Sequence, residues 1–484
     1  MDKTLQDGLN DALATHNYKS ALDYCHSLIK AGDQSPHLKA VNGWCLYKLG
    51  KTKEAEVLLV EAFNQDSKNH FIATVTISFY MERGEYEQVI TLTQYCVGLH
   101  ASDRLMWHRL GTAQFMLGDL AGSVIAFRRS LQVEALKSTA FALSQPLLCQ
   151  GHYQEGLELY EHRFDSYPQI NWPQSEKMPM PKWQGESLNS KSLLVWTEQG
   201  FGDCIQFSRI ITVLFEQGAV IDLMISNSHA SLAPLLETLK GVENVNVIDN
   251  KEVTLNRRYD YHSPMMSLMR GIKLTPTSVP APDGAYLHIP QTEQNAALTE
   301  QLTEIASHNN ELKIGIVWTT ALKSSFKEHD FLHFLQKERK SLNSDDVLPL
   351  LQLGKGFRFY SLHLEKSPAL QRVLDSQAVT DTSHCIGSFT DTARLIDAMD
   401  VIISIDTSVV HLAGALGKPT INLLPFAADW RWQCNREDSP WYPTMRLLRQ
   451  SFRNDWSTVI LRLQTLLSKI RNQQQKTGEV QVFL

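Results

Sequence analysis

The clearest indication of chemistry in the chain is Asp406 with Thr407, Ser408 and Val409, followed by His411. A short apolar run predicts a strand that ends at Asp406, and the next residues predict a helix. The first backbone N–H groups of a helix lack partners within it, and they lie at its positive end, so they would bind an anion such as a diphosphate without a metal. Two alternatives stay open: Asp406 and Thr407 act only as helix caps, and His411 either reaches the anion or packs against the sheet.

A second candidate is the carboxylate of Asp203, in a loop that also contains Gly200 and Gly202 and follows the apolar run 193–196. Glycines permit a tight turn between a strand and a helix. Ligands of open α/β sheets bind at such strand ends, so Asp203 is expected to face a cleft. Its structural alternative is to cap the following helix. Glu198, on the same loop, is the second acidic candidate.

Two common nucleotide-binding motifs do not fit these loops. A dinucleotide-binding loop needs a third glycine where this chain has Ile205. The nearest string to a P-loop, 414–419, has the wrong spacing and ends in Pro419 where a hydroxyl residue is required.

The elements that must position these residues alternate between short apolar runs and helical patterns. This order predicts two Rossmann-like units in tandem with a cleft between them. The expected strands are 193–196, 220–225, 245–248 and 259–262 in the first unit, and 313–318, 357–362, 401–405 and 420–424 in the second.

The first third of the chain has a different sequence pattern, a repeat of constant length. Gly50, Gly84 and Gly118 are 34 residues apart, and Gly151 follows 33 residues later. A constant period of this length is typical of a helix-turn-helix solenoid. With Trp107 and its neighbours, the pattern resembles the tetratricopeptide repeat.

The predicted fold class is therefore α + α/β, a helical solenoid followed by two Rossmann-like domains. The expected limits are 1–165 for the solenoid, 166–192 for a linker rich in proline and tryptophan, 193–305 and 306–452 for the two α/β domains, and 453–484 for a C-terminal helix and tail.

Composition narrows the class of protein. The chain has 484 residues, 43% of them hydrophobic and 20% charged, which predicts a globular protein of about three domains. No apolar run is long enough for a membrane span, and the start lacks the order of a signal peptide, so a cytoplasmic protein is expected. The seven cysteines form no Cys-x-x-Cys pair, which argues against a zinc site, and the charge of −6 argues against a nucleic-acid partner.

Three strings beyond residue 180 carry a family resemblance: 194–203, 406–419, and 429–432 with 438–443. Together they resemble GT-B glycosyltransferases related to bacterial heptosyltransferases. With the repeats, the chain resembles the repeat-bearing transferases implicated in glycosylating bacterial proteins such as flagellins.

This resemblance implies an inverting transfer from a nucleotide-sugar, with neither metal nor other cofactor. Asp203 matches the general base of the family, and Glu198 is the second choice. The relatives have a short loop with an Arg-Ser pair where this chain has about 20 inserted residues, 321–340, so Lys323 and Lys340 are the candidate cations at the diphosphate. The repeats would bind a polypeptide acceptor, with flagellin as the candidate.

Two other functions remain open at this point. One is transfer to lipopolysaccharide or another saccharide, with the repeats recruiting partners. The other is a scaffold without activity. The aromatic segment 430–442 would either stack against a sugar or base ring or pack in the core, and Arg431 between two tryptophans is interpreted as an internal stacking element.

Overall fold

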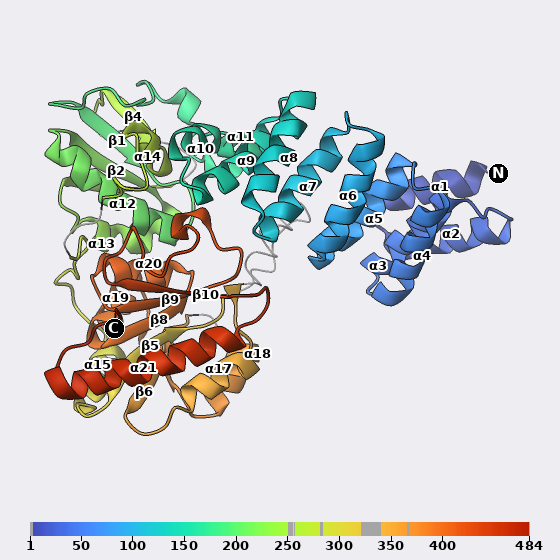
Figure 1. Ribbon diagram of the computed structural model, residues 1–484. Coiled ribbons are helices and arrows are strands. Elements are labelled where there is room, and N and C mark those ends of the chain that lie inside the picture. The colour runs from blue at the N-terminus through green and yellow to red at the C-terminus, as the bar shows by residue number, and fades with distance from the viewer. Residues whose placement is uncertain are drawn as a thin grey trace. The chain divides into compact units, whose positions relative to one another are not determined.

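The computed structural model describes residues 3–249, 255, 257–280, 284–320, 340–364 and 368–483. The chain forms two compact units, Met1–Pro146 and Leu147–Leu484. The predicted fold class is confirmed, because helical hairpins are followed by two parallel α/β sheets (Figure 1).

Antiparallel helical hairpins build the first unit. Its helices are α1 (Lys3–Ala14), α2 (Tyr18–Lys30), α3 (Pro36–Lys48), α4 (Thr52–Gln65), α5 (His70–Arg83), α6 (Tyr86–Leu99), α7 (Arg104–Met116) and α8 (Leu120–Val133), and α9 (Lys137–Cys149) crosses into the second unit.

The turn glycines account for the period of the repeats. Gly50, Gly84 and Gly118 have φ values of +80°, +70° and +79°. This left-handed region is readily available only to glycine, so each hairpin needs one at the same place in its turn.

Two other glycines, within helices, allow neighbouring helices to pack closely. Gly43 of α3 lies against Leu59 of α4, and Gly111 of α7 lies against Phe127 of α8, two repeats further along the chain. A Cβ atom at Gly111 would lie 2.9 Å from a ring carbon of Phe127. These contacts explain why the repeats contain glycine within helices, where it otherwise lowers stability.

After the end of α9, the second unit contains two further short helices. Its helices α10 (Tyr153–Tyr160) and α11 (Arg163–Ser166) lie beside the first sheet (Figure 1). The predicted end of the repeats, at residue 165, thus lies inside the second unit. The linker that follows contains the short 3-10 helices η1 (Pro168–Ile170) and η2 (Ser175–Lys177). Its Trp183 is buried, and its Trp172 donates a hydrogen bond to the carbonyl of Thr197.

The first sheet has four parallel strands in the order β3-β2-β1-β4. In its central strand, Trp196 lies opposite Met224 of β2 and Pro264 of β4. The elements are β1 (Ser192–Trp196), α12 (Phe201–Glu216), β2 (Val220–Ser226), η3 (Asn227–Leu232), α13 (Ala233–Leu236), β3 (Val242–Ile248), β4 (Tyr261–Pro264), η4 (Met265–Ser267) and α14 (Leu268–Gly271).

The second sheet has six parallel strands in the order β10-β9-β8-β5-β6-β7. This is the strand order of a dinucleotide-binding sheet. All strands are parallel, and the order in which the chain adds them reverses between β5 and β8. The elements are α15 (Ala296–Ser307), β5 (Leu312–Val317), α17 (Ser344–Leu351), β6 (Phe357–Ser361), α18 (Pro368–Asp375), β7 (Thr380–Asp381), η6 (Ser383–Cys385), α19 (Phe389–Ala398), β8 (Val401–Ile405), α20 (Ser408–Ala415), β9 (Thr420–Leu424), η7 (Trp430–Trp432), β10 (Met445–Arg449) and α21 (Ser457–Thr477).

Each sheet has its own hydrophobic core. The apolar face of α21, with Leu463, Leu467 and Ile470, packs on the core of the second sheet. Strands β7 and β10, which the sequence pattern did not predict, extend that sheet at its two edges. Within the part of the chain that the structure describes, no helix combines the length and the apolar character that a bilayer span requires.

The glycine contacts generate a test. We expect Gly111→Ala to lower the free energy of unfolding of the full chain by about 1 kcal/mol or more relative to Gly98→Ala, because the new methyl group overpacks against Phe127. Gly98 is an exposed position of α6 with nothing near its missing Cβ, so alanine there should be neutral or slightly stabilising. Urea unfolding followed by circular dichroism measures both. Equal effects of the two substitutions would contradict the packing role of Gly111.

Candidate active site

The topology of the second sheet selects one place for a ligand. Chain connections leave β5 and β8 in opposite directions, and ligands of such sheets bind at the carboxyl ends of the two strands. Asp406 and Thr407 follow β8 directly, and Thr319 and Thr320 follow β5. Asp406 and Thr407, which the sequence pattern singled out, therefore lie at the switch point of the second sheet.

The N-terminus of α20 keeps the character of an anion site. Thr407 takes the N-cap position with extended backbone, φ −133° and ψ 174°, and its side chain makes no capping hydrogen bond. Its hydroxyl oxygen lies instead 3.1 Å from that of Ser404. Thr407 and Ser408 are half-buried, and Val409 of the first turn is buried. The first amides of α20 thus point toward the site without a side-chain cap.

The carboxylate of Asp406 sits in a buried polar cluster beside this helix end. Lys340 Nζ donates to Asp406 Oδ2 at 2.8 Å, and His411 Nε2 lies 3.6 Å from Oδ1. Burial would raise the pKa of Asp406, but the Lys340 ammonium and His411 outweigh it and hold the pKa well below its usual value. Asp406 is therefore ionised, and Lys340 brings a positive charge to the end of β8.

His411 belongs mainly to the packing of the site. Its ring stacks on Trp432 with the centroids 5.3 Å apart, and its Nδ1 lies 2.9 Å from the hydroxyl of Tyr442. Burial lowers the pKa of His411, which favours the neutral ring. Trp432 and Tyr442 thus pack His411 in the core, while its Nε2 faces the Asp406 carboxylate; contact of His411 with an anion stays a prediction.

Asp203 lies at the start of α12 and has two partners. Its Oδ2 accepts a hydrogen bond from the backbone N–H of Gly200 at 3.1 Å, which caps the helix. Its Oδ1 accepts a hydrogen bond from Arg431 Nη2 at 2.7 Å. The Asp203 side chain keeps 17% of its surface exposed, so the carboxylate is still reachable. Capping, the structural alternative, therefore coexists with an ion pair.

Arg431 is the residue whose role the sequence pattern missed. Its guanidinium is held by three acceptors on two domains: Asp203 and Gln206 of α12, and Asp429 beside its own backbone. The guanidinium lies 5.5 Å from the Phe207 ring, so some stacking is also present. Asp203 and Gln206 are three residues apart on one face of α12, which was the available signal for a shared cationic partner.

Helices α12 and α20, from the two sheets, meet at this site. The contact is close at Gly202, where a Cβ atom would lie 2.7 Å from His411 Cδ2. The close approach of His411 thus requires glycine at position 202, whereas the N–H of Gly200 that bonds Asp203 does not depend on glycine.

The aromatic segment packs in the core. Trp430, Trp432, Trp441 and Tyr442 are at most 1% exposed. They surround the Arg431 turn, and Trp441 Nε1 donates to the carbonyl of Arg431 at 2.9 Å. A sugar or base ring could not stack on side chains with so little free surface, so the core alternative describes this segment.

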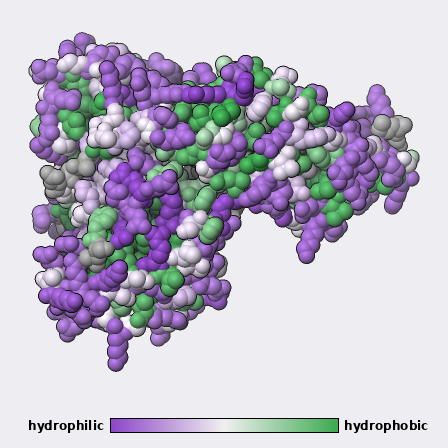
Figure 2. Space-filling view, viewed as in Figure 1, coloured by the Kyte–Doolittle hydropathy of each residue, from purple (hydrophilic) through white to green (hydrophobic). Residues whose placement is uncertain are grey.

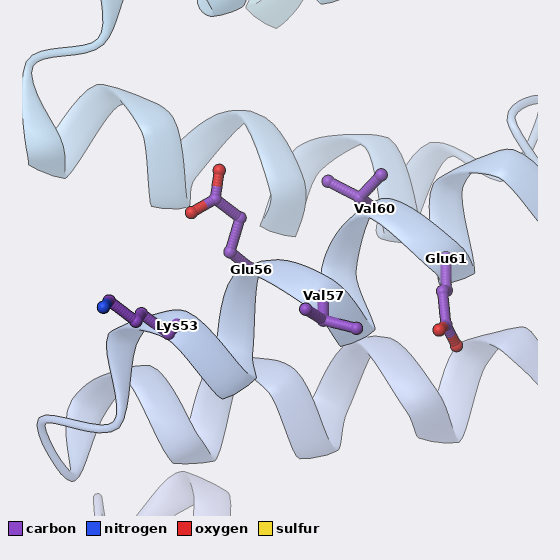
Figure 3. Close-up of a pocket in the computed structure, with 5 residues that line it drawn as sticks. All are labelled: Lys53, Glu56, Val57, Val60 and Glu61. Carbon is purple, nitrogen blue, oxygen red and sulfur yellow. The ribbon is translucent and has the colours of Figure 1, made fainter.

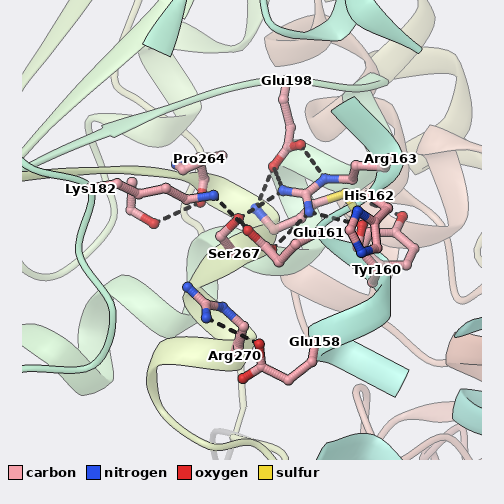
Figure 4. Close-up of polar contacts among 12 residues, drawn as sticks. Glu158, Tyr160, Glu161, His162, Arg163, Lys182, Glu198, Pro264, Ser267 and Arg270 are labelled. Carbon is pink, nitrogen blue, oxygen red and sulfur yellow. Dashed lines mark hydrogen bonds and ion pairs between the residues drawn. The ribbon is translucent and has the colours of Figure 1, made fainter. Parts of the chain in front are cut away.

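Glu198 has an environment that does not suit a general base. Its side chain is 1% exposed, and its two oxygens accept hydrogen bonds from Arg163 Nε and Nη2 at 2.6 and 3.0 Å (Figure 4). The Met266 N–H donates to the same carboxylate at 2.9 Å. With its oxygens engaged and no contact with solvent, Glu198 serves as a buried ion-pair partner, and we correct its candidate role accordingly.

A second carboxylate closes this buried network. Glu161 accepts a hydrogen bond from Arg163 Nη1 at 2.9 Å, and it also pairs with Lys182 and Ser267 (Figure 4). Burial would raise the pKa of Glu161, but Arg163 and Lys182 lower it to about 2.

Two predictions about ligands are not tested by these observations. Lys323 is outside the described residues, as is most of the insertion 321–340. Among the described side chains, no group of three or more His, Cys, Asp or Glu residues could hold a metal ion. Independence from metals and cofactors stays a prediction.

Comparison with known families matches both parts of the chain. Residues 7–116 match the model for the N-terminal tetratricopeptide repeat region of psidin, and residues 387–437 match glycosyltransferase family 9, the heptosyltransferases. The second segment contains Asp406, Thr407, His411 and Arg431. These matches confirm the resemblance seen in the sequence and support glycosyltransferase activity in a chain that carries tetratricopeptide repeats.

The individual proteins that resemble this chain have low sequence identity to it. The chain is 23% identical over 440 residues to Protein FlbA of Caulobacter vibrioides, covering 80% of this chain and 70% of that protein. A MamA structure from Desulfovibrio magneticus is 13% identical and covers 34% of this chain and 91% of its own, with a TM-score of 0.30. A tetratricopeptide repeat protein from Parabacteroides merdae is 18% identical and covers 36% and 69%, with a TM-score of 0.31.

The low pKa of Glu161 predicts a loss of stability in acid. The charged form contributes stability above the ordinary pKa of 4.5, and this contribution, about 3 kcal/mol, is lost as the pH falls toward about 2. We expect the melting temperature of the wild type to fall more steeply over this range than that of Glu161→Gln. Glu216→Gln, which removes an exposed partner of Lys240, should keep the wild-type slope. Parallel curves for the wild type and Glu161→Gln would contradict the assignment.

Proposed function

We propose that the chain is an inverting glycosyltransferase of the GT-B class that transfers a sugar from a nucleotide-sugar to an acceptor hydroxyl. One observation carries the proposal. A reachable carboxylate, Asp203, and a helix N-terminus without a side-chain cap, that of α20, come from different sheets and meet at the Gly202–His411 contact. Inverting transfer needs a base on one side of the sugar and a site for the leaving group on the other.

Asp203 is the general base of this proposal. Its carboxylate accepts the proton of the acceptor hydroxyl as that oxygen attacks the anomeric carbon. The N–H of Gly200 donates to one carboxylate oxygen and Arg431 donates to the other. These two bonds fix the carboxylate and leave further lone pairs free to accept the proton. The same two hydrogen bonds hold the carboxylate in one orientation for this proton transfer.

The leaving group is a nucleoside diphosphate. As the new bond to the acceptor oxygen forms, the bond from the anomeric carbon to the diphosphate breaks, and negative charge builds on the departing oxygen. The amides at Ser408 and Val409 and the positive end of α20 favour that charge. Lys340 pairs with Asp406 and so offsets the negative charge that this carboxylate would otherwise place beside the diphosphate. This arrangement supports transfer without a metal.

The acceptor in this proposal is a polypeptide bound by the repeats, with flagellin as a candidate. Solenoids present extended surfaces for binding. On α4, Val57 and Val60 are 56% and 37% exposed, in a shallow pocket of about 350 Å³ bordered by Lys53, Glu56 and Glu61 (Figure 3). Small hydrophobic groups of this kind interrupt the hydrophilic surface of the repeats (Figure 2). They support contact with side chains of a peptide.

The base can be tested by Asp203→Asn, which keeps an oxygen to cap α12 but cannot take a proton. We expect the rate of sugar transfer to fall by about 10² to 10⁴, with the KM for the nucleotide-sugar little changed. Release of nucleoside diphosphate from a panel of nucleotide-sugars, in the presence of cell protein as acceptor, measures both. Excess chelator should leave the wild-type rate unchanged.

The control is Asp260→Asn, which changes an aspartate of the same domain whose partners, Lys191 and Ser192, lie at the opposite, amino end of β1. It should transfer sugar at the wild-type rate. Full activity of Asp203→Asn would remove Asp203 from the mechanism, and no turnover by the wild type with any donor would count against transferase activity itself.

A further inference from the structure

The segment of α10 and α11 contacts the site from a direction that the sequence pattern did not anticipate. In sequence it continues the repeats, but its side chains reach both loops that hold the candidate base. These loops are 197–200, which leads to Asp203, and the η7 turn, which carries Arg431.

Arg163 of α11 fills the ligand position of the first sheet. In the order β3-β2-β1-β4, the strand order reverses between β1 and β4. An α/β sheet ordinarily binds its ligand at such a position. Glu198 follows β1, and Ser267 follows β4. Arg163 donates to both, to Glu198 at 2.6 and 3.0 Å and to Ser267 at 2.8 Å, and its side chain is fully buried (Figure 4). A side chain of the protein thus occupies the place of a ligand.

The tyrosines of α10 contact the same two loops. Gln199 donates to the hydroxyl of Tyr160 at 3.4 Å, and the Tyr160 ring packs edge-on against Trp430, with the centroids 6.2 Å apart. Tyr153 packs edge-on against Trp430 from another side, and its hydroxyl accepts a hydrogen bond from Gln433 at 3.1 Å. Trp430 and Gln433 lie on either side of Arg431 in the chain.

These contacts converge on the geometry of Asp203. Glu198 and Gln199 are fixed by Arg163 and Tyr160, and the next residue, Gly200, donates to Asp203. On the other side, the turn anchored by Tyr153 and Tyr160 presents Arg431 to the same carboxylate. A shift of about 1 Å at a reacting group can lower a rate by about a hundredfold, so a support of this kind affects catalysis without touching substrate.

We propose that Arg163, with Tyr153 and Tyr160, positions Asp203 for transfer, so that the α10–α11 segment is part of the catalytic unit and not of the acceptor-binding repeats. Its effect on turnover rests on the proposed function, whereas its effect on the two loops does not. Arg163 is a positioning residue, since it acts through Glu198.

The experiment compares three variants of the full chain. Arg163→Met removes the guanidinium but keeps a long apolar side chain. The double variant Arg163→Met/Glu198→Gln also removes the charge that would be left alone, while Gln keeps an oxygen for the Met266 N–H. Arg270→Met is the matched control, because Arg270 pairs with Glu158 of the same segment at 3.2 Å and with Gln184 of the linker, and neither partner belongs to the two loops (Figure 4).

Two readouts separate positioning from stability. For Arg163→Met we expect kcat to fall by about a hundredfold, with the donor KM within about twofold of wild type. The double variant should regain most of the lost melting temperature, because no buried charge lacks a partner, but it should not regain kcat. Recovery of kcat together with stability, or an equal loss in Arg270→Met, would overturn the proposal.

Hydrogen–deuterium exchange tests the same claim without turnover. Amides of 197–204 and 429–433 should exchange faster in the double variant than in wild type or Arg270→Met, under conditions where all are folded. Unchanged exchange in these segments would overturn the positioning role. If the wild type transfers no sugar but the exchange rises as expected, the proposed function fails and the positioning of the loops stands.

Discussion

The ion pair between Asp203 and Arg431 is the interaction on which the site depends. The two side chains belong to different sheets, are separated by 228 positions in sequence, and meet at 2.7 Å with 17% and 9% of their surfaces exposed. A charge so enclosed is stable only if its partners are in place. Gln206 and Asp429 accept further hydrogen bonds from the guanidinium, and the N–H of Gly200 donates to the carboxylate. Much of the surrounding architecture, including the close approach at Gly202 and the buried tryptophans, serves to keep these partners together.

The two sheets use the same topological feature for different ends. In each sheet, the strand order reverses between two neighbouring central strands. This reversal creates a crevice at the carboxyl ends of those strands. In the first sheet Arg163 fills this crevice and holds the loop that leads to the base. In the second, the crevice carries the Asp406–Lys340 ion pair and the start of α20, whose first amides have no side-chain cap. One crevice is therefore filled by a side chain of the protein, and the other is the one in which we propose that the diphosphate binds.

Local patterns in the sequence were enough to predict the elements and several site residues. The spacing of Gly50, Gly84 and Gly118 predicts the hairpins because a turn with positive φ requires glycine. Asp203 and Asp406 could be found because each follows a strand and begins a helix. The pairings could not, because Arg431 with Asp203 and Arg163 with Glu198 join distant segments, and nothing in local spacing encodes which segments meet. Glu198 shows the consequence: its loop suggested a base, and only its buried partner revealed an ion pair.

The central claim is that Asp203, held by Arg431, activates an acceptor hydroxyl on a protein. Intact-mass spectrometry tests it most directly, on proteins from cells that carry the wild-type chain, Asp203→Asn, or neither. The account predicts that at least one protein, with flagellin examined first, gains a discrete sugar mass only with the wild-type chain. A mass gain that persists with Asp203→Asn, or no gain on any protein, would contradict it.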